Sequence, residues 1–275
     1  MNFQKNKFLW FIKTRLVQLG FVAKPKFIIA GAQKSGTTAL FNILSQHKDI
    51  LPPIKKELNY FNNDPIYNKY KNKLRYYHSY FSVSLPFSKK IGLESTPLYL
   101  YHPDVARRIY SYNPNIKIII VLRDPVKRLI SAWNFYRSKH PDVFYQYYPK
   151  NITLSELING DIRNFENINY NSNPISLLRV GVYYEQLQRF FEQFSKDQIL
   201  VLDYDQLKSN YDLVIREILD FLGLSFEEIP NLKANITQKY DFSIYNTEVD
   251  LLKEFYKPFN KSLFELLGKE FSWTT

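Results

Sequence analysis

The sequence contains a glycine-bounded loop, Gly31-Ala-Gln-Lys34-Ser35-Gly36-Thr37-Thr38, directly after the apolar run 26–30. A strand, such a loop and a helix form the context of a phosphate-binding site, in which backbone N–H groups and a helix N-terminus face an anion. Thr37 takes the position of the lysine in a nucleoside triphosphate loop, and the lysine lies three residues earlier, at Lys34. This displacement argues against a triphosphate and favours a shorter group whose reacting atom lies close to a 5′-phosphate. The alternative is a glycine turn capped by Thr37, with Lys34 in solvent.

A second element that could bind phosphate follows the β-branched run 116–122, which is succeeded by Arg123. Ser131 lies two helical turns later and faces the same side. A guanidinium group matches phosphate oxygens, and a hydroxyl group adds a hydrogen-bond donor. The alternative is an arginine paired with Asp124 and a serine that packs on a helix.

The elements that must position these side chains alternate along the chain. Short apolar runs predict strands at 26–30, 91–94, 116–122 and 198–202, and helical spacing predicts helices at 37–46, 103–112, 125–138, 176–194, 211–222 and 249–267. This alternation predicts an α/β fold with a single P-loop-like domain, whose open, mostly parallel sheet is flanked by helices on both faces. In such sheets ligands bind outside the carboxyl ends of the strands, where both candidate elements begin.

Two segments lie outside this regular pattern. We expect residues 1–25 to be an N-terminal helical extension of a domain that spans 26–275. Residues 140–173 are rich in Asn, Tyr and Pro and predict a long excursion with one short helix near 154–158. Long excursions in compact domains are often binding loops, so we expect this one to shape an acceptor site.

Composition narrows the classes of protein. Of the 275 residues, 37 are Lys or Arg and 26 are Asp or Glu, which gives a net charge of +11 and fits an anionic cofactor, a polyanionic substrate, a membrane surface or nucleic acid. The basic residues are spread along the chain, which disfavours a nucleic-acid-binding arm. Without cysteine, disulfides and thiolate chemistry are excluded, and the four scattered histidines predict no metal site.

Membrane contact is expected to be peripheral at most. The apolar stretch at residues 8–12 is too short for a span, and residues 7–22 could form an amphipathic helix on a membrane or a partner. The alternative for residues 7–22 is a helix packed on the domain. We expect a cytoplasmic protein, and its oligomeric state stays open.

Taken together, the two phosphate elements resemble those of the sulfotransferases that use 3′-phosphoadenylyl sulfate (PAPS). The resemblance is nearest to their carbohydrate-directed branch, with the heparan sulfate enzymes and bacterial relatives, and it covers about residues 26–274. Further similar stretches are Lys56–Phe61, Glu94–Pro97 with Tyr99, Gly181–Tyr183, Phe221–Leu224, Phe255–Asn260, Leu266–Gly268 and Trp273.

This resemblance implies in-line transfer of a sulfuryl group from PAPS to a hydroxyl or amine of a small-molecule or glycan acceptor, without a metal. Lys34 is expected at the bridging oxygen between phosphate and sulfur, where charge grows in the transition state. Ser35, Gly36, Thr37 and Thr38 are expected to hold the 5′-phosphate. Arg123 and Ser131 are expected to hold the 3′-phosphate, with Tyr183 close to it; the alternative for Tyr183 is an aromatic residue in the core of a helix.

The resemblance also implies that Glu57 is the general base for the acceptor. The heparan sulfate enzymes follow the matching Glu with His and Asp, and this chain has Asn59 and Asn62 instead. The alternative for Glu57 is a loop ion pair with Lys55 or Lys56, and His47 is an alternative base. The C-terminal loop that closes over the donor in some branches has no clear counterpart here; Lys239 could take its place, and the favoured alternative is a lysine in solvent.

Two rival functions remain open at this point. A P-loop nucleotide kinase or ATPase would need an acidic Mg²⁺ partner, for which Asp124 is the obvious residue. A basic nucleic-acid-binding module would explain the charge and the aromatic residues, but the sequence has no recognisable reading motif, so we expect no nucleic acid.

Overall fold

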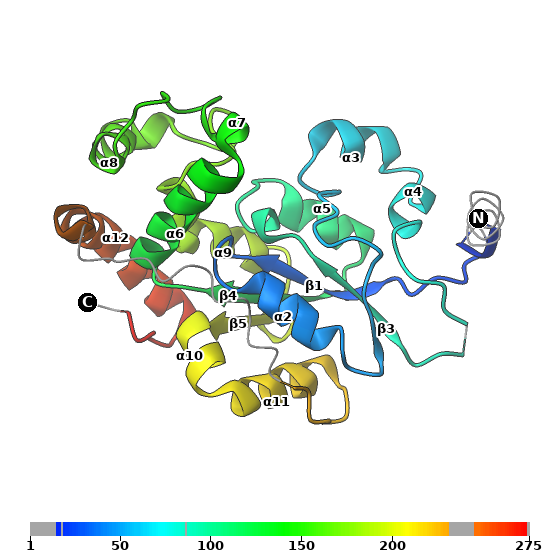
Figure 1. Cartoon of the computed structure of the whole chain (residues 1–275). Coiled ribbons are helices and arrows are strands. Elements are labelled where there is room, and N and C mark those ends of the chain that lie inside the picture. The colour runs from blue at the N-terminus through cyan, green and yellow to red at the C-terminus, as the bar shows by residue number, and fades with distance from the viewer. Residues whose placement is uncertain (1–14, 18, 86, 231–244, 274–275) are drawn as a thin grey trace, which may run out of the picture.

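The computed structural model describes residues 15–17, 19–85, 87–230 and 245–273 (Figure 1). Five parallel strands form one sheet in the order β2-β3-β1-β4-β5. The four predicted strands are confirmed to within one residue at each end, and the added strand β2 has only two residues. The strands are β1 (Pro25–Gly31), β2 (Ile50–Leu51), β3 (Ile91–Ser95), β4 (Lys117–Leu122) and β5 (Ile199–Asp203).

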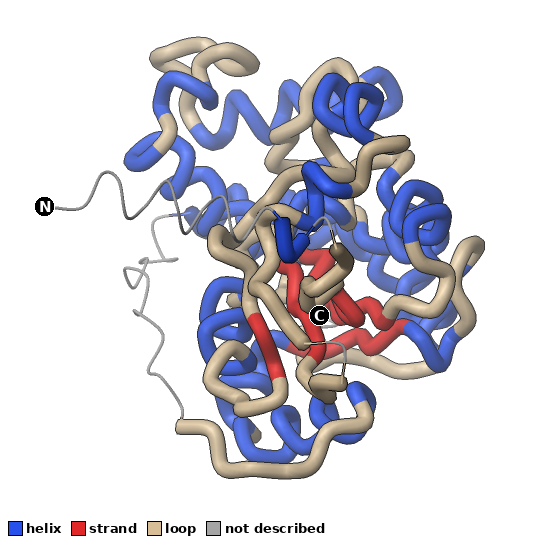
Figure 2. Tube along the Cα trace, turned by 90° about the vertical axis from the view of Figure 1, so that its right-hand side faces the viewer, coloured by secondary structure: helices blue, strands red, loops and turns tan. Residues whose placement is uncertain are grey.

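Helices cover both faces of the sheet, as the alternation predicts (Figure 2). Strand β4 is apolar throughout because alternate side chains enter two different cores: Ile118 and Ile120 pack on one face, and Ile119 and Val121 on the other. Helices α5 (Val105–Tyr112) and α9 (Tyr183–Phe191) lie over the first face. Helices α2 (Thr37–Leu44), α10 (Tyr204–Ser209) and α11 (Tyr211–Leu222) lie over the second.

A third core lies beside the sheet and holds the excursion. It joins α6 (Pro125–Lys139), α7 (Pro141–Phe144), α8 (Leu154–Arg163) and α12 (Asn246–Leu267). Helix α8 begins where predicted, because a reciprocal capping box between Thr153 and Glu156 starts it, and it runs further than predicted, to Arg163. Helix α7 was not predicted, since its four residues carry no helical periodicity.

The prediction of one helix over 176–194 is wrong in its first half. The chain forms a 3₁₀ turn, η3 (Arg179–Gly181), before α9 begins. The Leu177 carbonyl accepts a hydrogen bond from Arg128, and the Leu178 carbonyl accepts one from Tyr256 as well as the Gly181 N–H of the 3₁₀ turn at 3.0 Å. Tertiary partners therefore take the acceptors that a continuous helix would need.

The remaining elements are short. Asn63 caps α3 (Asp64–Tyr70) by accepting the Ile66 N–H at 3.0 Å, and α4 (Arg75–His78) follows; neither was predicted from this Tyr- and Lys-rich stretch. Three further 3₁₀ turns are η1 (Pro97–Tyr99), η2 (Phe165–Asn167) and η4 (Lys196–Gln198).

The proposed division into residues 1–25 and 26–275 stays a prediction, because residues 1–14 lie outside the described residues. Residues 15–17 are helical. None of the helices in the described part of the chain has the length and hydropathy of a membrane span.

Candidate active site

The loop between β1 and α2 has the geometry of an anion-binding turn. Gly36 caps α2 with a left-handed backbone (φ 81°) and has no side chain, so the first N–H groups of the helix have no capping side chain. Such N–H groups, at the positive end of a helix dipole, attract anions. The packing of Tyr204 explains the glycine, because a Cβ on Gly36 would lie 2.7 Å from the Tyr204 ring. The predicted strand–loop–helix arrangement is confirmed.

Lys34 extends from this loop to α6. Its backbone is also left-handed (φ 66°), and its Nζ lies 3.9 Å from the centre of the Phe135 ring. Burial and then the charge of Arg123 lower the pKa of Lys34 to about 8, whereas Glu57 acts in the opposite direction. Because such charge effects need proximity, Lys34, Arg123 and Glu57 share one site.

Arg123, directly after β4, is tied to the loop and to two aromatic rings. Its Nη1 donates to the Lys34 carbonyl at 3.1 Å, and its guanidinium carbon lies 5.0 Å from the centre of the Tyr204 ring. The Tyr183 hydroxyl donates to the Arg123 carbonyl at 2.8 Å and lies beside the fully buried Ser35. The structure therefore brings the predicted residues Ser35, Arg123 and Tyr183 together.

Arg128, one turn into α6, is a further cation that sequence reasoning missed. Its side chain is fully buried and donates to the Leu177 carbonyl, while its Nε and Nη1 have no hydrogen-bond partner among the described residues. Its charge adds to the lowering of the Lys34 pKa. The spacing of three residues to Ser131 was the available signal, since it places both side chains on one face of α6.

Lys34, Arg123 and Arg128 thus form a cluster of positive charge. None of the ion pairs between described residues includes any of the three. Like charges that are partly removed from water destabilise one another, and an oxyanion placed between them relieves this cost. The cluster and the free helix N-terminus both fit a ligand with phosphate groups.

Ser131 belongs to the same face of α6. It is buried, and it lies one turn after Arg128 and one turn before Phe135, which contacts Lys34. The side of α6 that carries Ser131 therefore faces the phosphate loop. Thr37 is buried at the start of α2, and Thr38 beside it is exposed.

Glu57 lies in the segment between β2 and α3, on the other side of the loop. Its N–H donates to the Ser95 carbonyl at 3.0 Å, and its backbone is left-handed (φ 60°). The half-exposed carboxylate accepts a hydrogen bond from the Lys56 Nζ at 2.6 Å. The Glu57 carboxylate therefore forms an ion pair with Lys56 and also lies close enough to Lys34 to raise its pKa. This places Glu57 at the edge of the cation cluster.

A buried carboxylate, Glu94, braces the segment that follows Glu57. Glu94 accepts hydrogen bonds from Tyr77, from Tyr99 at 2.5 Å and from Thr96 at 3.2 Å. The Tyr99 hydroxyl in turn accepts the N–H of Tyr60 at 3.1 Å and of the next residue at 3.3 Å. Burial raises the pKa of Glu94 to about 7. The resembling stretches Lys56–Phe61 and Glu94–Tyr99 therefore form one hydrogen-bonded unit.

The other residues singled out in the sequence have different surroundings. Both ring nitrogens of His47 are engaged beyond the end of α2, by the Ser225 carbonyl at 3.1 Å and the Asp49 N–H at 3.1 Å. The Asp124 carboxylate caps α6 by accepting the Val126 N–H at 2.8 Å. Lys239 lies outside the described residues.

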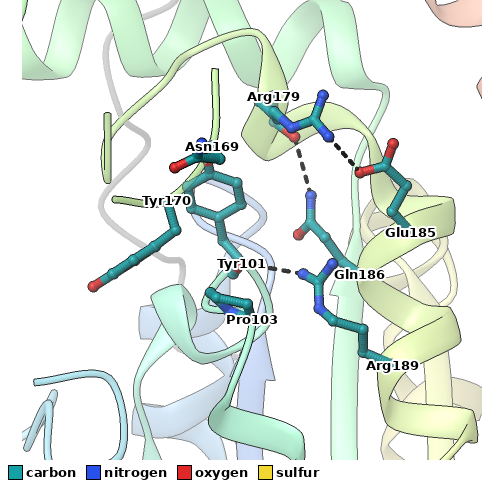
Figure 3. Close-up of a pocket in the computed structure, with 8 residues that line it drawn as sticks. All are labelled: Tyr101, Pro103, Asn169, Tyr170, Arg179, Glu185, Gln186 and Arg189. Carbon is teal, nitrogen blue, oxygen red and sulfur yellow. Dashed lines mark hydrogen bonds and ion pairs between the residues drawn. The ribbon is translucent and has the colours of Figure 1, made fainter. Parts of the chain in front are cut away.

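A separate pocket lies between the end of the excursion, the start of α5 and α9 (Figure 3). Its guanidinium groups have partners in the protein: Arg179 contacts Glu185 at 3.0 Å, and Arg189 donates to the Tyr101 carbonyl at 3.1 Å. The pocket contains none of the predicted site residues. We interpret it as a packing gap at the contact between the excursion and α9. Its lining residues are Tyr101, Pro103, Asn169, Tyr170, Arg179, Glu185, Gln186 and Arg189.

Comparison with known proteins decides the family. A family model described as "Sulfotransferase domain" matches residues 24–257. The chain belongs to the sulfotransferase family. Sulfotransferases of this kind use PAPS as the sulfuryl donor, so the enzyme class and the co-substrate expected from the sequence are confirmed, and the kinase alternative is not supported.

This sulfotransferase is similar to two named relatives and one solved structure. It is 26% identical to the membrane-associated sulfotransferase kil1 of Dictyostelium discoideum, over 90% of this chain and 66% of that protein. It is also 26% identical to human heparan sulfate glucosamine 3-O-sulfotransferase 5, over 90% of this chain and 74% of that protein. A sulfotransferase structure from Alicyclobacillus acidocaldarius matches with a TM-score of 0.71 and 26% identity, over 92% of this chain and 100% of that one. This match confirms the expected fold.

Proposed function

We propose that this sulfotransferase transfers the sulfuryl group of PAPS to a hydroxyl or amine of a glycan, and that the cluster of Lys34, Arg123 and Arg128 attracts the donor. The observation that carries the donor site is this group of three cations, none of which forms a direct ion pair with a carboxylate among the described residues. Bound PAPS supplies a sulfuryl group on a phosphate leaving group together with a separate 3′-phosphate. Its negative charges would offset the repulsion within the cluster.

The phosphate loop binds the 5′-phosphate in this proposal. The free N–H groups at the start of α2 and the hydroxyls of Ser35, Thr37 and Thr38 supply hydrogen bonds, and Gly36 lets the backbone curl. Lys34 stabilises the charge that grows on the bridging oxygen as the bond between that oxygen and sulfur breaks. Its low pKa reflects a partly buried ammonium group, whose interaction with an anion is stronger than in water.

The 3′-phosphate is assigned to Arg123 and Ser131. Arg123 is partly exposed, and its guanidinium group donates through Nη1 to the Lys34 carbonyl, so its other terminal nitrogen, Nη2, remains for an oxyanion. Tyr183 orients Arg123 through the Arg123 carbonyl. Arg128 has no exposed surface, so its contribution is the field of a buried charge and the support of α6.

Glu57 is the proposed general base. It would accept the acceptor's proton as the acceptor oxygen forms its bond to sulfur and the bond between sulfur and the bridging oxygen breaks. To act as the base, the Glu57 carboxylate must release its hydrogen bond from the Lys56 ammonium group and accept one from the acceptor instead. The Glu94 network supports the role, because it fixes the backbone that follows the base, through the N–H groups of Asn59 and Tyr60.

A carbohydrate acceptor is supported by the similarity to the human enzyme named for heparan sulfate glucosamine. The excursion at residues 140–173 contributes through Tyr170, whose hydroxyl donates to the Asn62 carbonyl at 3.0 Å, five residues after Glu57. Its role in shaping the acceptor site, and the cytoplasmic location expected from the sequence, stay predictions.

Isothermal titration calorimetry with two nucleotides tests the donor site. Adenosine 3′,5′-bisphosphate should bind about ten- to hundredfold more tightly than adenosine 5′-phosphate, because the Arg123–phosphate hydrogen bonds are charge-assisted. Arg123→Ala should remove most of that preference, whereas Arg137→Ala, an arginine that stacks on Trp133, should keep it. Equal affinity of the wild-type protein for both nucleotides would refute the assignment.

A further inference from the structure

Large apolar side chains are exposed together where the described chain begins. Phe87 is 96% exposed, Leu85 and Leu19 are each 72% exposed, and Ile54 is 67% exposed. Exposed apolar groups that gather on a soluble protein mark interaction surfaces. We call the surface the amino-edge patch and define it as Leu19, Lys24, Ile54, Lys55, Val83, Leu85, Phe87, Lys89 and Lys90.

Backbone hydrogen bonds hold the segments of the amino-edge patch side by side. The Ala23 N–H donates to the Ser82 carbonyl at 2.9 Å, and the Ser84 N–H donates to the Phe21 carbonyl at 3.4 Å. The Ile54 N–H donates to the Tyr80 carbonyl at 2.8 Å. The patch is therefore one surface built from three parts of the chain.

Two of the three segments of the amino-edge patch lie away from the donor site, and the third, with Ile54 and Lys55, follows β2 and leads to Glu57. Residues 19–24 precede β1 and residues 83–90 precede β3, so both reach the amino ends of these parallel strands. The phosphate loop and Arg123 follow the carboxyl ends of β1 and β4. Figure 1 shows the start of the described chain beside the loop that leads to β3, on the side opposite α8 and α12.

The charge of the amino-edge patch has one sign. Residues 19–26, 52–56 and 82–90 contain six lysines and no Asp or Glu, and one of the six, Lys56, pairs with Glu57 just beyond the second range. Lys24, Lys55, Lys89 and Lys90 are exposed. Protruding apolar side chains with lysines around them suit the interface of a bilayer with anionic headgroups. A second copy of the same patch would instead place lysines against lysines.

The chain that leads into the patch has the same chemistry. Residues 1–24 contain five Lys or Arg and no Asp or Glu, and residues 8–12 read Phe-Leu-Trp-Phe-Ile. We propose that the amino-edge patch docks this enzyme on an anionic lipid bilayer. The carboxyl edge of the sheet, with the donor site, then points away from the docked surface.

Sedimentation with lipid vesicles tests the docking of the full chain. The protein should sediment with vesicles of phosphatidylcholine and phosphatidylserine, and much less with phosphatidylcholine alone. Phe87→Ser should weaken binding by about tenfold or more, the effect of removing one buried aromatic side chain. The double variant Lys89→Gln/Lys90→Gln should weaken it about 25-fold, at about fivefold per lysine, and added salt should reduce the wild-type binding.

Matched controls lie on α11, which covers one face of the sheet, and on α12. Leu213→Ser removes an apolar side chain that is 69% exposed on α11, and Lys253→Gln removes an exposed lysine; neither should change vesicle binding. All these variants should keep wild-type affinity for adenosine 3′,5′-bisphosphate, which separates docking from the donor site. The proposal is overturned if the wild-type protein does not bind phosphatidylserine vesicles, if patch variants bind as the wild type does, or if Phe87→Ser only dissolves a dimer.

Discussion

Nucleotide binding should be coupled to the protonation of Lys34. The pKa of this ammonium group is lowered to about 8, first by burial and then by the charge of Arg123. A lowered pKa means that the charged form is disfavoured in the free site, and phosphate groups should restore it. Binding of adenosine 3′,5′-bisphosphate should therefore take up a proton at alkaline pH.

The size of the effect follows from the pKa. At pH 8 about half of the Lys34 side chains are neutral, so binding should take up roughly 0.5 proton, and at pH 6.5 almost none. Through Lys34 alone, affinity should fall about tenfold between pH 7 and pH 9. The nucleotide contributes little above pH 7.5, because the second pKa of a phosphate monoester is about 6.

Calorimetry in two buffers with different ionisation enthalpies measures this uptake, since the observed heat shifts by the protons exchanged. Lys34→Met should abolish the uptake at pH 8, and Lys34→Arg should also abolish it because a guanidinium stays charged. Melting temperatures would establish that both variants fold. If the wild-type protein and Lys34→Met take up equal numbers of protons, the cation cluster is not where the nucleotide binds.

Three further changes test other parts of the site. Glu57→Gln should reduce sulfuryl transfer to a hydroxyl acceptor by about 10²–10⁴ while nucleotide affinity and melting temperature stay near wild type, and retained activity would place the base elsewhere. Gly36→Ala should cost about 1–3 kcal/mol through its left-handed φ, with more from the Tyr204 ring, and should weaken nucleotide binding in titrations. Glu94 has a native pKa of about 7, above its ordinary value of 4.5, so its contribution to stability is full at low pH and is lost as pH rises from about 4.5 to 7. In chemical denaturation at several pH values, Glu94→Gln should lack this loss, and identical pH profiles would contradict it.

The sheet and its order of elements were predictable because their signals are local. Runs such as Ile118–Leu122 have no polar interruption, and a buried parallel strand requires this. The breakdown of the 176–194 helix was not predictable, since it depends on Arg128 and Tyr256 reaching carbonyl groups from distant segments. The periodicity of a local sequence carries no information about such competition between distant side-chain donors and the helix backbone for the same carbonyl groups.

The candidate site was predictable where a sequence motif specifies the backbone shape. It was unpredictable where a residue's role depends on residues that are distant in the sequence but close in the fold. The loop at residues 31–38 and Arg123 follow from glycine spacing and strand ends. Arg128 looks like an ordinary basic residue of a helix, and only its burial without a counter-ion reveals its place in the cluster. Tyr204, which packs on Gly36 and Arg123, opens α10 without any sequence signal.

The strand order has a consequence for how acceptor preference could change over evolution. From β1 the sheet extends one way through β3, which carries Glu94, and β2, which precedes Glu57. It extends the other way through β4 and β5, which are followed by Arg123 and Tyr204. The phosphate loop of β1 sits at the switch point between these halves. Under the proposed assignment, substitutions, insertions or deletions in the half that carries Glu57 can therefore alter which acceptor group is presented, while the half that carries Arg123 keeps its geometry. The fold separates the part that can diversify from the part that must stay constant.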